Sequence, residues 1–140
     1  MRRIFTLILT LMFLCACNKL AVEPDIKSVV TSDTVLVDLT ILSTVTPSNI
    51  IQGQNIISNV RCFGSNLCYN FAKFEVLETS PRQFEIKAKS TYPTGRDIGC
   101  FDAIYYKDTT FEINTPASGQ YVLKFLNNNQ IFKTDIVQVD

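Results

Sequence analysis

Apolar and polar residues alternate along most of the chain after residue 33, which is the period of half-buried β-strands. The alternation is clearest over residues 82–90, where Phe84, Ile86 and Ala88 are separated by charged or amide side chains. One face of this strand is therefore expected in the core and the other in water. The same pattern predicts strands over residues 34–45, 54–63, 69–78, 109–114, 120–126 and 130–139. No segment in this part shows a sustained helical period.

Proline, glycine and asparagine clusters separate these segments. Asn127, Asn128 and Asn129 lie between the last two predicted strands, and asparagine tolerates the positive φ that tight hairpin turns require. Residues 91–108 are less regular, with Pro93 and Gly95, and are interpreted as a long connection that holds a strand or short helix near residues 101–106. Strands spaced by turn signals at intervals of about 8 to 12 residues are typical of an Ig-like sandwich.

The N-terminus has the layout of a secretory signal. Arg2 and Arg3 precede an apolar run over residues 4–14, which is shorter than the roughly 20 apolar residues that a membrane-spanning helix needs. Cleavage after Ala16 would place Leu14 where an ordinary cleavage site has a small residue, so a plain secreted protein is the weaker alternative.

The sequence Leu14-Cys15-Ala16-Cys17 resembles the lipobox of bacterial lipoproteins. The resemblance implies that residues 1–16 are removed and that Cys17 becomes the acylated first residue, bound to a membrane by its acyl chains. Asn18 follows Cys17, and an aspartate at that position is the inner-membrane retention signal in enteric bacteria. The resemblance therefore favours the outer membrane of the cell envelope. Residues 17–33 are interpreted as a tether and residues 34–140 as one domain.

A second resemblance lies in residues 116–125. Pro116, Gly119, Tyr121 and Leu123 match the P-x-x-G-x-Y-x-L pattern that leads into strand F of Ig-like domains, where the tyrosine forms the tyrosine corner. Leu123 stands where true immunoglobulin domains have their second cysteine, and the chain has no tryptophan. The fold expected is thus all-β, an Ig-like antiparallel sandwich of about seven strands after a lipoprotein signal peptide. Taken together, the chain resembles small bacterial lipoproteins.

Length and net charge indicate how many domains the chain forms and which kind of partner it does not bind. Removing residues 1–16 leaves 124 of the 140 residues, a length that suits a single core. Eleven basic and thirteen acidic residues remain, a net charge of −2 without a long run of either sign. Nucleic-acid binding would need clustered Lys and Arg, so no nucleic-acid partner is expected.

Three cysteines follow the lipobox in a chain expected to be exported to an oxidising compartment. We expect a disulfide between Cys68 and Cys100, with Cys62–Cys68 as the alternative pairing. The leftover Cys62 would then be a buried small hydrophobic residue rather than a reactive thiol. A metal site is disfavoured because the spacing is not a paired C-x-x-C pattern and the chain has no histidine.

Catalysis is the least favoured function. Histidine, the usual acid or base at neutral pH, is absent. Asp97, Asp102 and Asp108 fall in the irregular segment, but their spacing does not distinguish them from ordinary solvated acids or match a calcium loop. We therefore expect no enzyme, no metal and no cofactor.

Aromatic residues gather in the same irregular segment. Tyr92, Phe101, Tyr105 and Tyr106 lie near Arg96, and such side chains on loops of a rigid scaffold often recognise proteins or sugars. Two hypotheses follow. The first is a non-catalytic, membrane-anchored module that contacts a protein partner in the envelope, with the aromatic residues covering one end of the core. The second is a glycan- or peptide-binding module that uses residues 92–106, which requires a concave pocket lined by those tyrosines.

Overall fold

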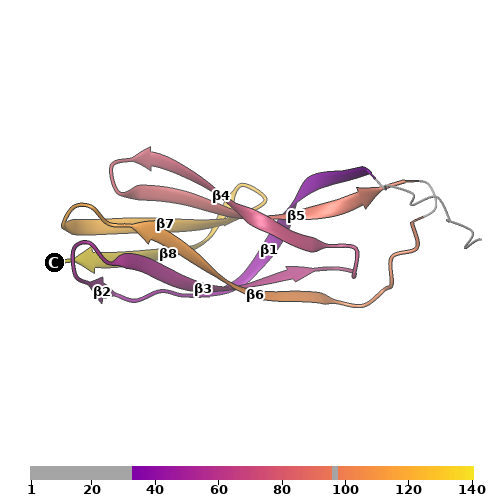
Figure 1. The fold of residues 1–140 in the computed structure, drawn as a ribbon, viewed down its shortest axis with the longest axis horizontal. Coiled ribbons are helices and arrows are strands. Elements are labelled where there is room, and N and C mark those ends of the chain that lie inside the picture. Colours follow the sequence, from indigo (N-terminus) through magenta and orange to yellow (C-terminus); the bar gives the residue numbers. More distant parts are fainter. Residues whose placement is uncertain (1–32, 96–97) are drawn as a thin grey trace, which may run out of the picture. The chain divides into compact units, whose positions relative to one another are not determined.

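The structure is a computed structural model that describes residues 33–95 and 98–140. These residues form eight β-strands and no helix (Figure 1). In chain order the strands are β1 (Asp33–Val45), β2 (Asn49–Ile50), β3 (Asn55–Gly64), β4 (Asn70–Ser80), β5 (Gln83–Thr94), β6 (Tyr105–Asn114), β7 (Gly119–Asn127) and β8 (Gln130–Val139). The all-β class and the seven predicted strands are confirmed, whereas the alternation does not predict the two-residue β2. The predicted signal peptide, Cys17 and all of the tether except Asp33 lie outside the described residues.

The connection predicted over residues 91–108 is shorter than expected. Strand β5 continues to Thr94 because its last residues pair with the first residues of β1, Asp33↔Thr94 and Thr34↔Pro93 among them. Strand β6 begins at Tyr105, which pairs with Gly64 at the end of β3. Pairing with these strands thus keeps both ends of the segment extended. The connection itself is residues 95–104.

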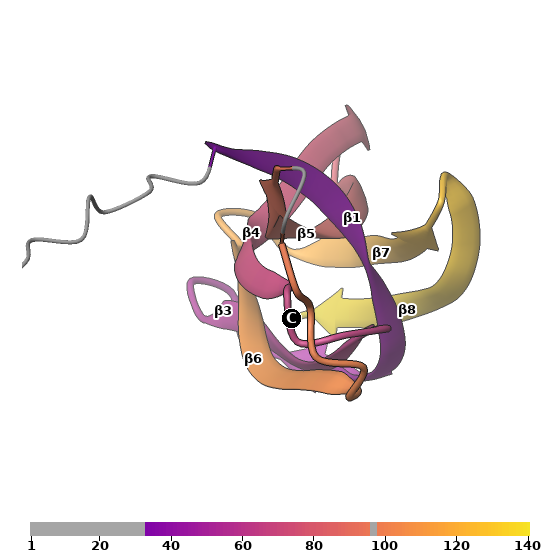
Figure 2. The same ribbon diagram turned by 90° about the vertical axis from the view of Figure 1, so that its right-hand side faces the viewer.

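The strands form one curled sheet. Their hydrogen-bonded order is β2, β8, β7, β5, β1, β3, β6, and β4 pairs with β5 alone. The β5–β7 and β2–β8 pairs are parallel, and the others are antiparallel. Seen along the long axis of the domain, the strands surround a common interior (Figure 2).

Strand β1 produces the curl because its two halves pair with different strands. Residues Asp33 to Leu39 pair with β5, and from Thr40 onward β1 pairs with β3. The register shifts between Ile41 and Ser43, immediately after this change of partner. A bulge bends its strand and increases the local twist, which directs β3 and β6 to the opposite side of the core.

The core lies between the two sides of the curl. Phe111 of β6 packs edge-on against Phe74 of β4, with ring centroids 5.4 Å apart, and against Phe125 of β7 at 6.2 Å. Side chains that the alternation places inward on β3 are fully or almost fully buried: Ile56, Val60 and Cys62. The alternation therefore identifies the inner face of this strand correctly.

Side-chain hydrogen bonds join the two sides of the curled sheet at a point where the backbones of the strands do not pair. Asn127, at the end of β7, accepts the N–H of Ile41 at 2.8 Å through Oδ1 and donates from Nδ2 to the carbonyl of Ile41 at 2.9 Å. Nearby, Asp135 of β8 accepts from the hydroxyls of Thr44 at 2.9 Å and Thr46 at 2.6 Å. These bonds join β7 and β8 to the end of β1.

Candidate functional site

The aromatic residues predicted to form a binding site differ in burial. Tyr92 and Tyr105 are partly buried, and both hydroxyls are used inside the domain. The Tyr92 hydroxyl lies 3.3 Å from Nδ2 of Asn66 and 3.5 Å from Sγ of Cys100, while the Tyr105 hydroxyl accepts the N–H of Phe71 at 3.0 Å. Both hydroxyls therefore have partners within the domain, and these contacts tie the two tyrosines to one end of it.

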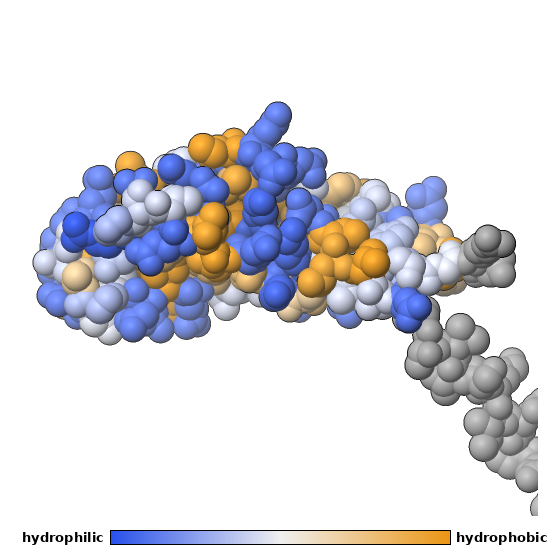
Figure 3. Space-filling model, turned by 90° about the horizontal axis from the view of Figure 1, so that it is seen from above, coloured by the Kyte–Doolittle hydropathy of each residue, from blue (hydrophilic) through white to orange (hydrophobic). Residues whose placement is uncertain are grey.

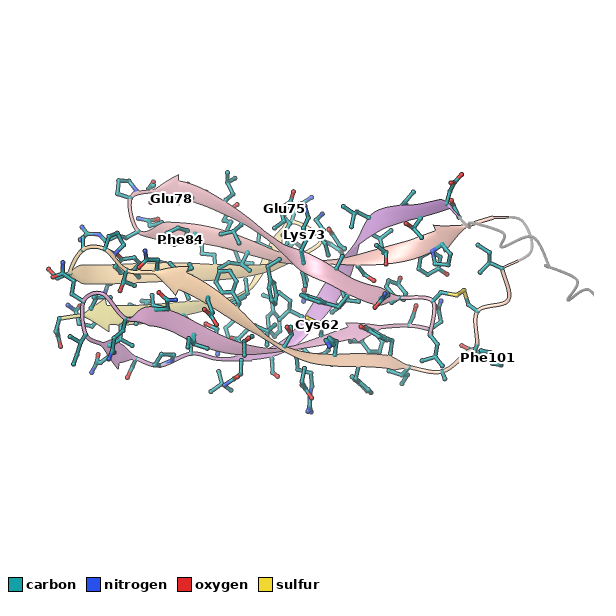
Figure 4. All side chains as sticks on the ribbon, in the orientation of Figure 1. Cys62, Lys73, Glu75, Glu78, Phe84 and Phe101 are labelled. Carbon is teal, nitrogen blue, oxygen red and sulfur yellow. A yellow bond between two sulfur atoms is a disulfide. The ribbon has the colours of Figure 1, made fainter. Side chains whose placement is uncertain are left out.

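Phe101 and Tyr106 are instead exposed, at 78% and 57%. Phe101 lies on the connection at the end of the domain that is on the right in Figure 4. Tyr106 is on β6, where its ring packs against Phe63 at 6.0 Å. Arg96 lies outside the described residues. These aromatic residues line neither the cleft between the ends of β4 and β6 nor the hollow at Arg61 on β3 and β6.

A disulfide joins Cys68 to Cys100, the pairing preferred from the sequence, with their Cα atoms 5.4 Å apart. It connects the turn between β3 and β4 to the connection between β5 and β6. The N–H of Leu67 also donates to the carbonyl of Phe101 at 3.2 Å. The disulfide therefore holds together two surface segments, the turn after β3 and the connection after β5.

Cys62 is free and completely buried within the described domain (Figure 4). Burial, and to a lesser extent the negative charge of Asp108, raise the pKa of its thiol to about 12. A thiol must be ionised to act as a nucleophile, so Cys62 is chemically inert near neutral pH.

A cleft of about 540 Å³ lies at the end of the domain opposite Phe101. It lies where β4 and β6 end, because these two strands are not paired with each other. Residues of β4, β5, β6 and β7 and of two turns line it: Glu78, Pro81, Arg82, Phe84, Ile113, Asn114, Pro116, Ala117 and Tyr121. Glu78 and Phe84 mark its position at the left of Figure 4.

The floor of the cleft is aromatic. The ring of Phe84 stacks on that of Tyr121, with centroids 6.4 Å apart and planes 5° from parallel. Tyr121 is buried, and its hydroxyl donates to the carbonyl of Ala117 at 3.0 Å. Phe84 is only partly buried, which leaves an apolar surface beneath the opening.

Charged groups border this apolar floor. The N–H of Arg82 donates to Oε1 of Glu78 at 3.1 Å, and Nη1 of Arg82 donates to the carbonyl of Ser118 at 2.5 Å. Arg82 has φ of 65°, a left-handed conformation that is uncommon for a residue with a side chain. Its side chain is thus held across one end of the cleft, with further guanidinium donors available to a bound carbonyl or carboxylate.

A shallower hollow of about 420 Å³ lies on the outer face of β3 and β6, lined in part by Arg61 and Asp108. Arg61 binds both carboxylate oxygens of Asp108, at 2.7 and 2.9 Å, and this contact lowers the pKa of Asp108. Asp108 is therefore part of an exposed ion pair, and Asp97 lies outside the described residues. Within residues 33–95 and 98–140, no three acidic or cysteine side chains come close enough to hold a metal ion.

Sequence reasoning missed the cleft. It singles out Pro116 and Tyr121, but Pro81 and Phe84, which also line the cleft, lie more than 30 residues earlier in the chain. Their proximity depends on the parallel pairing of β5 with β7, which places Phe84 opposite Leu123. Local alternation contains no signal for that pairing.

Comparison of the chain with protein-family models, with curated proteins and with solved structures found no significant match. Within the part of the chain that the structure describes, no helix has the length and apolar character required to span a membrane.

Proposed function

We propose that the protein is a lipid-anchored lipoprotein of the cell envelope and that it acts as a non-catalytic protein-interaction module. The lipobox at residues 14–17 supports acylation of Cys17, and Asn18 favours the outer membrane. The non-catalytic role is supported by a chain without histidine and by a free cysteine whose thiol is protonated at neutral pH. The finer fold that we propose is an Ig-like sandwich.

Tyr121 supports the Ig-like assignment. In a tyrosine corner the tyrosine hydroxyl bonds to the backbone a few residues upstream, and here it bonds to the carbonyl of Ala117, four positions earlier. Packing of Phe111 across the core against β4 and β7 is consistent with two facing layers of strands.

The cleft is the observation that most directly supports a role in protein interaction. It combines an apolar floor with a carboxylate and a guanidinium, and β4 borders it with one edge that pairs with no described strand. A strand edge offers free N–H and C=O groups to an extended peptide, and a neighbouring pocket can accept one of its side chains. We therefore propose an extended segment of an envelope protein as the partner, with an apolar side chain over Phe84.

The position of the cleft fits an anchored module. Strand β1 starts at one end of the domain (Figure 1), and Glu78 and Phe84, which line the cleft, lie toward the other end (Figure 4). A partner bound in the cleft would contact the end of the domain that is directed away from the membrane. On the face that Figure 3 shows, hydrophilic areas separate several apolar areas between the two ends.

Photo-crosslinking in membranes of the native host tests this role. A photoreactive residue at Glu78, beside the cleft, should give one discrete adduct, and Phe84→Ala should remove most of it. The matched control is the same residue at Glu112, which is exposed on β6. Equal adducts at both positions, or none at Glu78, would contradict a partner in the cleft.

A glycan- or peptide-binding role over residues 92–106 is the second candidate. Tyr106 favours it, because it is exposed on the same face of β6 as Asp108, beside the hollow at Arg61. An aromatic ring next to paired polar groups is a common element of recognition sites. Tyr106→Ala should then abolish binding on a glycan array while leaving the Glu78 adduct unchanged.

A further inference from the structure

Three large apolar side chains are exposed at the end of the domain where the disulfide lies. Leu67 is 51% exposed, Phe101 78% and Ile104 54%. We call these three residues the apolar tip. Single exposed apolar residues need no explanation, but these three lie on adjoining segments at one end of the fold.

The disulfide builds the apolar tip. Leu67 directly precedes Cys68, and Phe101 directly follows Cys100, so the bond holds the two apolar residues beside each other. The hydrogen bond from the Leu67 N–H to the Phe101 carbonyl fixes the same pair. Ile104 immediately precedes Tyr105, whose hydroxyl is bonded to the backbone of Phe71. The apolar side chains are thus presented from a braced support rather than from a free loop.

The apolar tip lies at the end where the chain enters the domain. Asp33, the first residue of β1, pairs with Thr94, and the Thr94 hydroxyl donates to the Asp33 carbonyl at 2.8 Å. The connection that holds Phe101 begins immediately after Thr94. Figures 1 and 2 show the start of β1 and this connection at the same end.

The length of chain before Asp33 then limits where this end can be. Fifteen residues separate Cys17 from Asp33, and even a fully extended chain over that interval spans at most about 58 Å. Acyl groups on Cys17 would therefore keep the start of β1, and with it the apolar tip, near the lipid surface. We propose that the apolar tip inserts into the interfacial region of the membrane and so orients the domain, an inference that rests on the proposed anchor.

The residues of the apolar tip suit a lipid surface better than a protein partner. A stable protein interface needs about 800 Å² from each partner, far more than three side chains supply. Lipid imposes no such threshold, because the acyl anchor keeps the local concentration high and each inserted side chain adds apolar burial. Residues 66–68 and 100–104 together contain one charged side chain, that of the acid Asp102, so insertion of this part of the domain does not require anionic lipid.

The absence of tryptophan from the chain permits a direct test. The full-length gene carrying F101W is expressed in the native host, and the acylated protein is reconstituted into phosphatidylcholine vesicles. The matched control is I51W, since Ile51 is exposed and lies before the start of β3, whereas Leu67 of the apolar tip follows the end of that strand. We expect blue-shifted emission and quenching by brominated lipid for F101W only. Adding Leu67→Ser and Ile104→Ser should lower that quenching about tenfold.

Each other outcome has a definite meaning. No lipid quenching of acylated F101W, or equal quenching of I51W, would overturn the insertion. A concentration-dependent blue shift without vesicles would also overturn it and would indicate association of two copies. If intact mass shows no acyl groups, the anchor proposal fails. The secreted F101W protein is then titrated with the same vesicles, where quenching supports insertion without an anchor and its absence overturns it.

Discussion

Replacing Asn127 by alanine should destabilise the domain more than any ordinary surface substitution. The Asn127 side chain satisfies both backbone groups of Ile41, accepting its N–H at 2.8 Å and donating to its carbonyl at 2.9 Å. Ile41 lies just beyond Leu39, the last residue of β1 that pairs with β5. At Ile41, where β5 no longer pairs with β1, the Asn127 side chain thus makes the two hydrogen bonds that a neighbouring strand would make.

The cost can be estimated from burial. Ile41 is 0% exposed with the Asn127 side chain in place, so in the native chain its N–H and carbonyl depend on that amide rather than on water. An unsatisfied buried donor or acceptor costs about 1 to 3 kcal/mol, and Asn127→Ala leaves one of each. The free energy of unfolding should therefore fall by about 2 to 6 kcal/mol, a large share of the roughly 5 to 15 kcal/mol of a typical domain.

Urea unfolding followed by tyrosine fluorescence measures this loss, with the disulfide kept oxidised. Asn59→Ala is the matched control, because Asn59 is exposed on β3 and the same change there should stay within about 0.5 kcal/mol. Amide exchange at Ile41 provides a local readout and should accelerate in Asn127→Ala. A loss under about 1 kcal/mol, with the Ile41 amide still protected, would refute the reasoning.

Three further predictions concern ionisable and sulfur groups. Burial raises the pKa of Asp135, but bonds from Thr46, Lys133 and Thr44 outweigh it and lower the pKa overall. Asp135 therefore stabilises the fold above its unfolded pKa of about 3.9, and this stability is lost as the pH falls through the lower folded pKa. Between about pH 5 and pH 2, the unfolding free energy of the native chain should fall more steeply than that of Asp135→Asn; equal slopes would contradict this account. Cys62, with its thiol pKa of about 12, should resist alkylation at pH 8 until urea unfolds the chain, and rapid labelling of the folded protein would show that it is accessible. Reducing the Cys68–Cys100 disulfide, whose cysteines are 32 positions apart, should lower the unfolding free energy by about 3 to 4 kcal/mol, and an unchanged urea midpoint would count against this loop-entropy estimate.

The sequence predicts the strands well because alternation is a local property. Ile56, Val60 and Cys62 share a face in the pattern and are all buried in the structure. The asparagine turn is also confirmed, since Asn128 and Asn129 have positive φ of 48° and 65°. These features depend on residues only a few positions apart.

Features that depend on distant segments could not be predicted in this way. The turn interpretation of Asn127 misses its bonds to Ile41, which is 86 positions earlier. The hydroxyls of Tyr92 and Tyr105 look available in the sequence, yet partners on other segments occupy them. The cleft depends on the β5–β7 pairing for the same reason, so neither the site nor its partner strand is visible in local alternation.

The pairing of β1 determines how the domain would carry mechanical load. A pull on Asp33 from a membrane anchor, resisted by a partner held at the cleft, would act nearly along β1. Seven register pairs, from Asp33↔Thr94 to Leu39↔Ala88, would then bear the force together in shear instead of opening one after another. Strand β1 is therefore placed to withstand tension that reaches the domain through the chain before Asp33.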